Sequence, residues 1–68
     1  MRITYDSEAD AASIYFTEIR PGGVTRTYSC DPSEVGSDIH LDFDSDGRLL
    51  GVEVLDASRK LPKDLLKT

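Results

Sequence analysis

The stretch DFDSDGRLLGVE places oxygen ligands at the spacing of a calcium-binding loop. Asp42, Asp44 and Asp46 stand at the first, third and fifth positions of that loop. Gly47 stands at its sharp turn, and Glu53 at the last position, which normally gives two oxygens to the ion. Such a loop binds calcium when one helix leads into it and another leads out. The residues on either side therefore decide whether the pattern is a metal site.

Those flanking residues favour strands over helices. Pro32 and Gly36 interrupt the segment before the loop, and both residue types are unfavourable in a helix interior. Residues 39–43 then alternate between apolar and polar, and residues 50–54 do the same. Asp-Gly between two alternating segments is a strong signal for a β-hairpin. We therefore expect a hairpin here and not a calcium-binding helix–loop–helix.

The register of this hairpin follows from its apolar residues. If Asp46 and Gly47 form a two-residue corner, Phe43 faces Leu50 and the apolar residues of both strands lie on one face. A three-residue loop would pair Phe43 with Leu49 and would scatter the apolar residues over both faces. We therefore expect the two-residue corner. It also pairs Leu41 with Val52 and Ile39 with Val54.

The opposite face of the hairpin gathers polar side chains. In the expected register His40, Asp42, Asp44 and Glu53 share this face, and His40 lies directly opposite Glu53. Carboxylates this close can hold a divalent cation weakly, with waters completing its shell. The alternative is a solvated acidic face with one His40–Glu53 pair. We expect the solvated face, so these four residues are only weak candidates for a metal site.

Cys30 and His40 are the chain's single cysteine and single histidine. A Cys–His nucleophile pair needs contact between the side chains, and nothing local in the sequence brings these two together. One cysteine and one histidine also supply only two of the four ligands that zinc usually takes. Gly22-Gly23 lacks the following helix of a phosphate-binding loop. We therefore expect no enzyme activity, no catalytic residues and no cofactor.

The elements that position these residues are mostly strands. Residues 2–6 and 12–17 alternate between apolar and polar on either side of a polar tight turn. After a Pro-Gly-Gly turn, residues 24–30 are rich in β-branched and aromatic side chains, which predicts a third strand. Asp31-Pro32 ends that strand, because proline cannot donate a hydrogen bond to a sheet. The polar residues 33–38 are expected to form a loop.

The C-terminal residues change to a helical pattern. Leu61, Leu65 and Leu66 have helical spacing, Asp56 and Ser58 are capping residues, and Pro62 suits a first helical turn. A short C-terminal helix can lay these leucines over the apolar face of the sheet. The expected fold class is α+β, mainly β, as a single domain over residues 1–68. Its small antiparallel sheet has about five strands in meander-like hairpins.

Length and charge limit what this domain can bind. Sixty-eight residues allow only a thin core, since a chain of this size buries about 60% of its unfolded surface. The net charge is −5, with −8 in residues 1–58 and +3 in residues 59–68. This acidic body disfavours nucleic acid, because phosphate contacts dominate such binding. The lone cysteine and the lack of a signal peptide or membrane segment predict a cytoplasmic protein.

Three segments together resemble a known family. YDSEADAASIYF, LDFDSDGRLLGVEVLDAS and the final LP…LL are similar to the small bacterial proteins grouped as domain of unknown function 2283. The resemblance covers about residues 4–66, and the stretch from Asp46 to Ser58 is its most specific part. It implies a compact β-rich domain with a short C-terminal helix. The family has no established activity, so the resemblance implies no catalytic or binding residues.

Two classes of function fit these observations best. The leading hypothesis is a non-enzymatic protein-interaction module. Tyr15, Tyr28 and Leu49 are expected to face outward, which favours a homo-oligomer. The acidic body also favours a small basic protein partner, as when an antitoxin masks a basic toxin. The alternative class is a weak divalent-cation or ligand-binding module that uses the acidic hairpin face.

Overall fold

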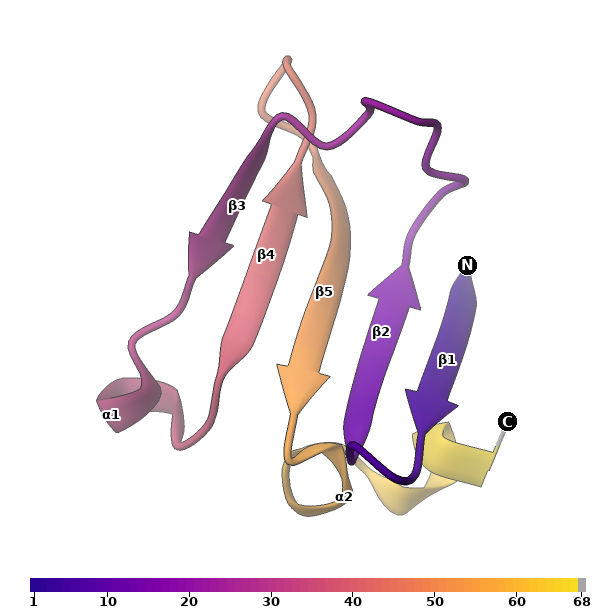
Figure 1. The fold of residues 1–68 in the computed structure, drawn as a ribbon, viewed down its shortest axis with the longest axis vertical. Helices are drawn as coiled ribbons and strands as arrows, with labels where there is room; N and C mark the ends of the chain where they lie inside the picture. The colour runs from indigo at the N-terminus through magenta and orange to yellow at the C-terminus, as the bar shows by residue number, and fades with distance from the viewer. Residues whose placement is uncertain (68) are drawn as a thin grey trace.

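A computed structural model of the chain describes residues 1–67 as five strands, two one-turn α-helices and one 3-10 helix. The strands form a single antiparallel sheet in the order β1-β2-β5-β4-β3 (Figure 1). The expected α+β fold with a five-stranded antiparallel sheet is confirmed. The elements are β1 (Arg2–Asp6), β2 (Ala11–Tyr15), β3 (Arg26–Ser29), α1 (Pro32–Val35), β4 (Ile39–Phe43), β5 (Leu49–Leu55), α2 (Ala57–Lys60) and η1 (Lys63–Lys67).

One connection departs from a simple meander. Strand β1 pairs with β2, β3 with β4, and β4 with β5, so three connections join neighbouring strands. The fourth, residues 16–25, leads from β2 to the far edge of the sheet, where β3 lies (Figure 1). Strand β2 is therefore free to pair with β5. This pairing brings Ala12 opposite Val54, and their side chains are among the most buried of the chain.

The β4–β5 hairpin is confirmed, but its loop has three residues rather than the predicted two. The Asp44 amide donates to the Arg48 carbonyl (3.0 Å), and the Gly47 amide donates to the Asp44 carbonyl (3.1 Å). The Asp44 carboxylate also accepts hydrogen bonds from the amides of Asp46 and Arg48, both at 2.9 Å. Gly47 has a φ of +80°, as a three-residue hairpin loop ending in a left-handed residue requires. These contacts favour the longer loop over an Asp46-Gly47 corner.

A β-bulge then restores the register that the longer loop shifts. Phe43 pairs with Leu49 and not with Leu50 as predicted, whereas Asp42 pairs with Gly51. Leu50 is therefore an extra residue in β5. Beyond the bulge the pairing is the predicted one, with Leu41 opposite Val52 and Ile39 opposite Val54. Ile39, Leu41, Val52 and Val54 therefore share one face, as predicted.

The segment predicted as a loop at residues 33–38 begins inside the one-turn helix α1. Asp31 is its N-cap, because the carboxylate accepts hydrogen bonds from the amide (3.0 Å) and hydroxyl (2.8 Å) of Ser33. Pro32 occupies the first turn, where a missing amide proton costs nothing. Gly36 ends the helix with a φ of +84°. The strand before it, β3, is shorter than the predicted 24–30.

The predicted C-terminal helix forms as two short pieces, α2 and η1. The chain is extended at Leu61, because a residue that precedes a proline disfavours the helical conformation. Leu61 and Leu66 nevertheless pack against the core, as predicted, whereas Leu65 is half-buried outside that cluster. That core is small, because its buried apolar residues are Ala12, Val54 and Ala57, with exposed fractions of 2, 3 and 0%.

Candidate functional site

The sheet has one apolar and one polar face. Its register places Ile3, Ile14, Val52, Leu41 and Tyr28 side by side across all five strands. Because side chains alternate along a strand, the next residues of each strand point to the other side. Those residues form a polar row, namely Thr4, Ser13, Glu53, His40 and Ser29. The two faces therefore differ in chemistry along their whole width.

The helices cover only one end of the apolar face. Ala57, Leu61 and Leu66 of the C-terminal segment pack with the row formed by Tyr5, Ala12, Val54 and Ile39. In Figure 1 α2 and η1 accordingly lie at one end of the sheet, beyond β5 and β1. The rest of this side carries seven half-buried or exposed apolar residues, which we call the open apolar face; one of them, Val52, borders the core. They are Ile3, Ile14, Phe16, Tyr28, Leu41, Phe43 and Val52.

Two aromatic residues of the open apolar face are highly exposed. Tyr28 is 49% exposed and Phe16 is 45% exposed, although both lie among apolar neighbours. The exposure predicted for Tyr28 and Leu49 is confirmed, whereas Tyr15 is half-buried on the polar face. An exposed, contiguous apolar surface on a small domain is typical of a protein contact site.

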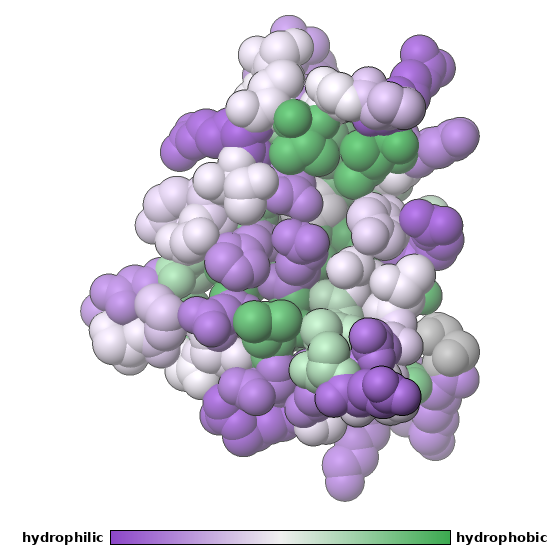
Figure 2. Space-filling model, viewed as in Figure 1, coloured by the Kyte–Doolittle hydropathy of each residue, from purple (hydrophilic) through white to green (hydrophobic). Residues whose placement is uncertain are grey.

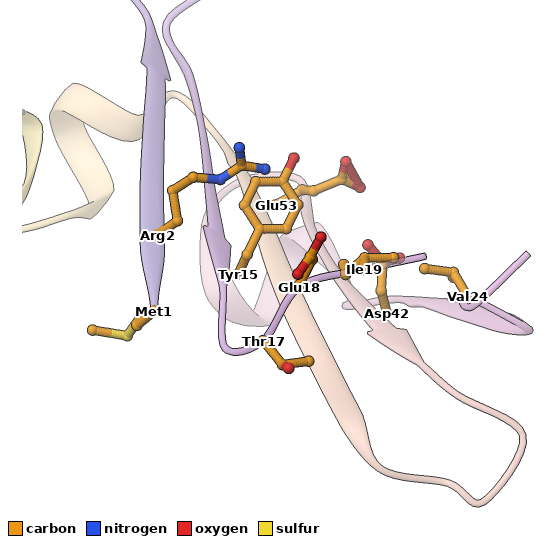
Figure 3. A pocket seen from close by; sticks show the side chains of 9 residues that line it. All are labelled: Met1, Arg2, Tyr15, Thr17, Glu18, Ile19, Val24, Asp42 and Glu53. Carbon is orange, nitrogen blue, oxygen red and sulfur yellow. The ribbon is translucent and has the colours of Figure 1, made fainter. Parts of the chain in front are cut away.

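The polar face holds a hollow of about 720 Å³ beneath the β2–β3 connection (Figure 3). Glu18, Ile19 and Val24 come from the connection, while Asp42 and Glu53 rise from β4 and β5. Figure 2 shows this side of the molecule, with hydrophilic side chains over the middle of the sheet and apolar ones gathered near its top. The full lining is Met1, Arg2, Tyr15, Thr17, Glu18, Ile19, Val24, Asp42 and Glu53.

Arg2 and Tyr15 form one wall of this hollow (Figure 3). The Arg2 guanidinium lies 4.7 Å from the centre of the Tyr15 ring, in the range of a cation–π contact. Gly51 is the partner of Tyr15 in the sheet, and a Cβ atom at Gly51 would lie 2.8 Å from the Ile14 carbonyl oxygen. A neighbouring backbone thus approaches Gly51 closely.

The four weak metal candidates do not converge. The Asp44 carboxylate is used in the hairpin loop, and the Asp42 carboxylate accepts a hydrogen bond from the Thr27 hydroxyl (2.7 Å). His40 lies opposite Glu53, as predicted, and its Nδ1 shares a hydrogen bond of 2.9 Å with the Ser29 hydroxyl. Within residues 1–67, no three His, Cys, Asp or Glu side chains are arranged to hold a metal ion.

Cys30 lies closer to His40 in the sheet than the sequence suggested. The Cys30 amide donates to the Ile39 carbonyl (2.8 Å), one position beyond the Ser29–His40 pair. Alternation nevertheless puts the Cys30 side chain on the helix side of the sheet and the His40 side chain on the polar side. The two residues are therefore neighbours along the ladder without forming a nucleophile pair.

Asp10 organises the end of the sheet where the helices attach, and sequence reasoning missed it. Its carboxylate accepts hydrogen bonds from the Tyr5 hydroxyl (2.7 Å) and from the Ser58 amide (3.0 Å) and hydroxyl (2.7 Å). These bonds lower the pKa of Asp10, the Tyr5 bond most of all, and the same bond raises the pKa of Tyr5. The side chain of Asp56, the predicted cap, accepts no capping hydrogen bond from a backbone amide of α2. The first turn of the chain thus caps its last α-helix.

Comparison with known proteins identifies a family but no activity. The family model described as "Protein of unknown function (DUF2283)" matches residues 2–58. No curated protein matches the chain, and no solved structure matches it either. Within residues 1–67, the structure contains no helix that is long and apolar enough to cross a membrane.

Proposed function

The chain belongs to the DUF2283 family of proteins of unknown function, and we propose that it is a non-enzymatic protein-interaction module. The open apolar face carries this proposal. Its seven apolar residues span every strand of the sheet, while the C-terminal segment packs at one end of the same side. Covering such a surface releases about 25 cal/mol for each Å² removed from water, which is the main driving force of protein association.

The proposed interaction uses the apolar side because the polar side chains there are few. Among the strand residues of the described chain, Arg26 is the one charged residue whose position faces the helix side. Its guanidinium lies 5.7 Å from the centre of the Phe43 ring, at the corner of the open apolar face. A partner would therefore meet an apolar centre with a single cation at its rim, which is the usual anatomy of an interface.

Photo-crosslinking in the producing organism tests this proposal. A photoreactive phenylalanine analogue replaces Tyr28 in one variant and Thr27 in a matched control, so that adjacent residues probe opposite faces. We expect irradiation to attach a protein to the Tyr28 variant and not to the Thr27 variant. Equal labelling of both variants, or no adduct from either, would contradict the proposal.

A second candidate partner is a small basic protein bound on the polar face, as in an antitoxin-like role. The hollow favours it, since Glu18, Asp42 and Glu53 line the cavity together with a single arginine, Arg2. The acidic body would steer a cationic partner toward this side. Titration with an arginine-rich peptide should show binding that weakens with added salt and in an Asp42→Asn, Glu53→Gln variant. Binding that the double variant leaves unchanged would exclude the hollow as its site.

We also propose that the protein works in a reducing compartment such as the cytosol. A single half-buried cysteine, Cys30, suits an environment in which thiols stay reduced.

A further inference from the structure

We infer that the partner on the open apolar face is a second copy of this chain, in a two-fold symmetric dimer. This inference rests on the proposed function and names its partner. Its starting point is the thin core of the single chain. No side chain larger than valine is nine-tenths buried among the apolar residues of the described chain, and Val54 is the largest that reaches this level.

A domain this small often has an additional source of stability. The common sources are disulfides, a structural metal and association with another subunit. The chain has one cysteine, so it cannot form an internal disulfide. Within residues 1–67 the potential metal ligands do not gather into a group of three. Association with another subunit is the source that the open apolar face supplies.

The amount of exposed surface fits a dimer. The chain exposes 4848 Å², whereas a compact monomer of its mass exposes about 4,250 Å². The excess, about 600 Å², approaches the ~800 Å² that each partner buries in a standard interface. One flat sheet with one layer of helices over one end accounts for this excess, because most of its apolar side lacks a second layer.

The geometry of the missing layer suits a second sheet. Two packed sheets lie about 10 Å apart and packed helices about 8–10 Å apart, so layers of either kind have a similar depth. A partner sheet can therefore continue the layer that α2 and η1 begin over the row of Tyr5, Ala12, Val54 and Ile39. A two-fold axis through the open apolar face lets the same seven residues serve on both subunits.

Charge also favours this mode of self-association. Each chain carries −5, so two copies repel each other unless their carboxylates stay apart. The strand carboxylates Asp42 and Glu53 lie on the polar face, beside the hollow. Contact through the opposite face keeps these groups on the outer surfaces of the dimer. Contact through the polar faces would bring them together.

Light scattering coupled to size exclusion tests the dimer with purified protein. We expect the wild-type chain to elute at twice its 7.5 kDa mass over micromolar concentrations. A Phe16→Glu, Tyr28→Glu variant should have a dimer dissociation constant at least about tenfold higher, because association would desolvate the new carboxylates. Both positions are nearly half exposed in the single chain, so circular dichroism should show the fold retained.

A control variant, Thr4→Glu, adds the same charge at an exposed strand position on the polar face. In light scattering this variant should show the same dimer mass as the wild-type chain. A wild-type monomer at all concentrations, or equal dissociation of both variants, would overturn the dimer. If the purified chain is monomeric while Tyr28 still crosslinks to a different protein in cells, the dimer is wrong and the interaction module stands. If Tyr28 crosslinks to nothing, the proposed function falls as well.

Discussion

Asp10 shows how one residue can join distant parts of a small chain. It adopts a left-handed φ of +50° at the end of the β1–β2 turn, a conformation that aspartate tolerates better than most residues. Its carbonyl accepts a hydrogen bond from the Ala57 amide (2.9 Å), and its carboxylate bonds Ser58. The backbone amides at the start of α2 therefore find their hydrogen-bond acceptors in a residue almost 50 positions earlier. A local capping pattern cannot reveal such a partner.

The lowered pKa of Asp10 gives its contribution to stability a definite pH dependence. A carboxyl group with a folded pKa below its unfolded value stabilises the fold above the unfolded pKa of about 4. That stability is lost as the pH falls through the folded pKa. We expect Asp10→Asn to lower the melting temperature at pH 7, and the difference from wild type to shrink below pH 4. Thermal melts by circular dichroism measure both, and a difference that stays constant with pH would contradict this role.

Gly51 lies where the neighbouring strand leaves no room for a side chain. An added Cβ would lie 2.8 Å from the Ile14 carbonyl oxygen, and a backbone atom in a paired strand cannot easily move. We expect Gly51→Ala to reduce the free energy of unfolding by about 1–3 kcal/mol. Urea denaturation measures the change. The neighbouring substitution Ser13→Ala, which removes atoms, should change it by less than about 0.5 kcal/mol; equal effects of both substitutions would contradict the close-approach explanation.

At the level of elements, the hairpin explains why a calcium pattern can occur without a calcium site. Its ligand positions alternate along strands, so Asp42 and Glu53 stand on the polar face while Asp44 closes the loop. We expect titration with calcium at millimolar concentration to give no saturable heat. Heat with a defined stoichiometry that disappears in an Asp42→Asn, Glu53→Gln variant would instead establish a weak cation site on this face.

The elements also show which parts of a fold local patterns predict. Alternation predicted four of the five strands and the pairing of Leu41 with Val52, because burial of one face fixes these features. The strand within residues 24–30 was predicted from its β-branched and aromatic side chains. The reasoning from alternation rejected the three-residue loop, since it did not allow for a bulge at Leu50 that restores the register. The helix α1 was missed although Asp31 and Pro32 are an ordinary helix start. Both errors concern single turns, where one or two hydrogen bonds decide the outcome.

At the level of the whole molecule, the order of the strands depends on long-range pairing. Ala12 meets Val54 across more than 40 residues, and no turn in the sequence specifies that contact. The connection that permits it, residues 16–25, also builds the hollow over the polar face. The acidic lining of the hollow could be anticipated only in part. Asp42 and Glu53 were recognised on one face. Glu18 and Arg2 come from the β2–β3 connection and from β1, and only the strand order brings them to the hollow.

The two faces separate the chain's apolar surface from its strand carboxylates. The open apolar face provides area for association, and the polar face keeps the acidic side chains in water. This division explains how an acidic domain with a thin core can associate with a second acidic copy. It also assigns each proposed partner, a second copy or a basic protein, to its own side of the sheet.

The methyl groups of the open apolar face report most directly whether protein covers it. Nuclear magnetic resonance of methyl-labelled protein with a soluble paramagnetic chelate measures how far each methyl is shielded from solvent. We predict that the methyls of Ile14, Leu41 and Val52 are more protected in the wild-type chain than in the Phe16→Glu, Tyr28→Glu variant, while those of Leu55 on the polar face do not differ. If the methyls of Ile14, Leu41 and Val52 are equally accessible to the chelate in the wild-type chain and in this variant, the apolar face is not covered and the account is contradicted.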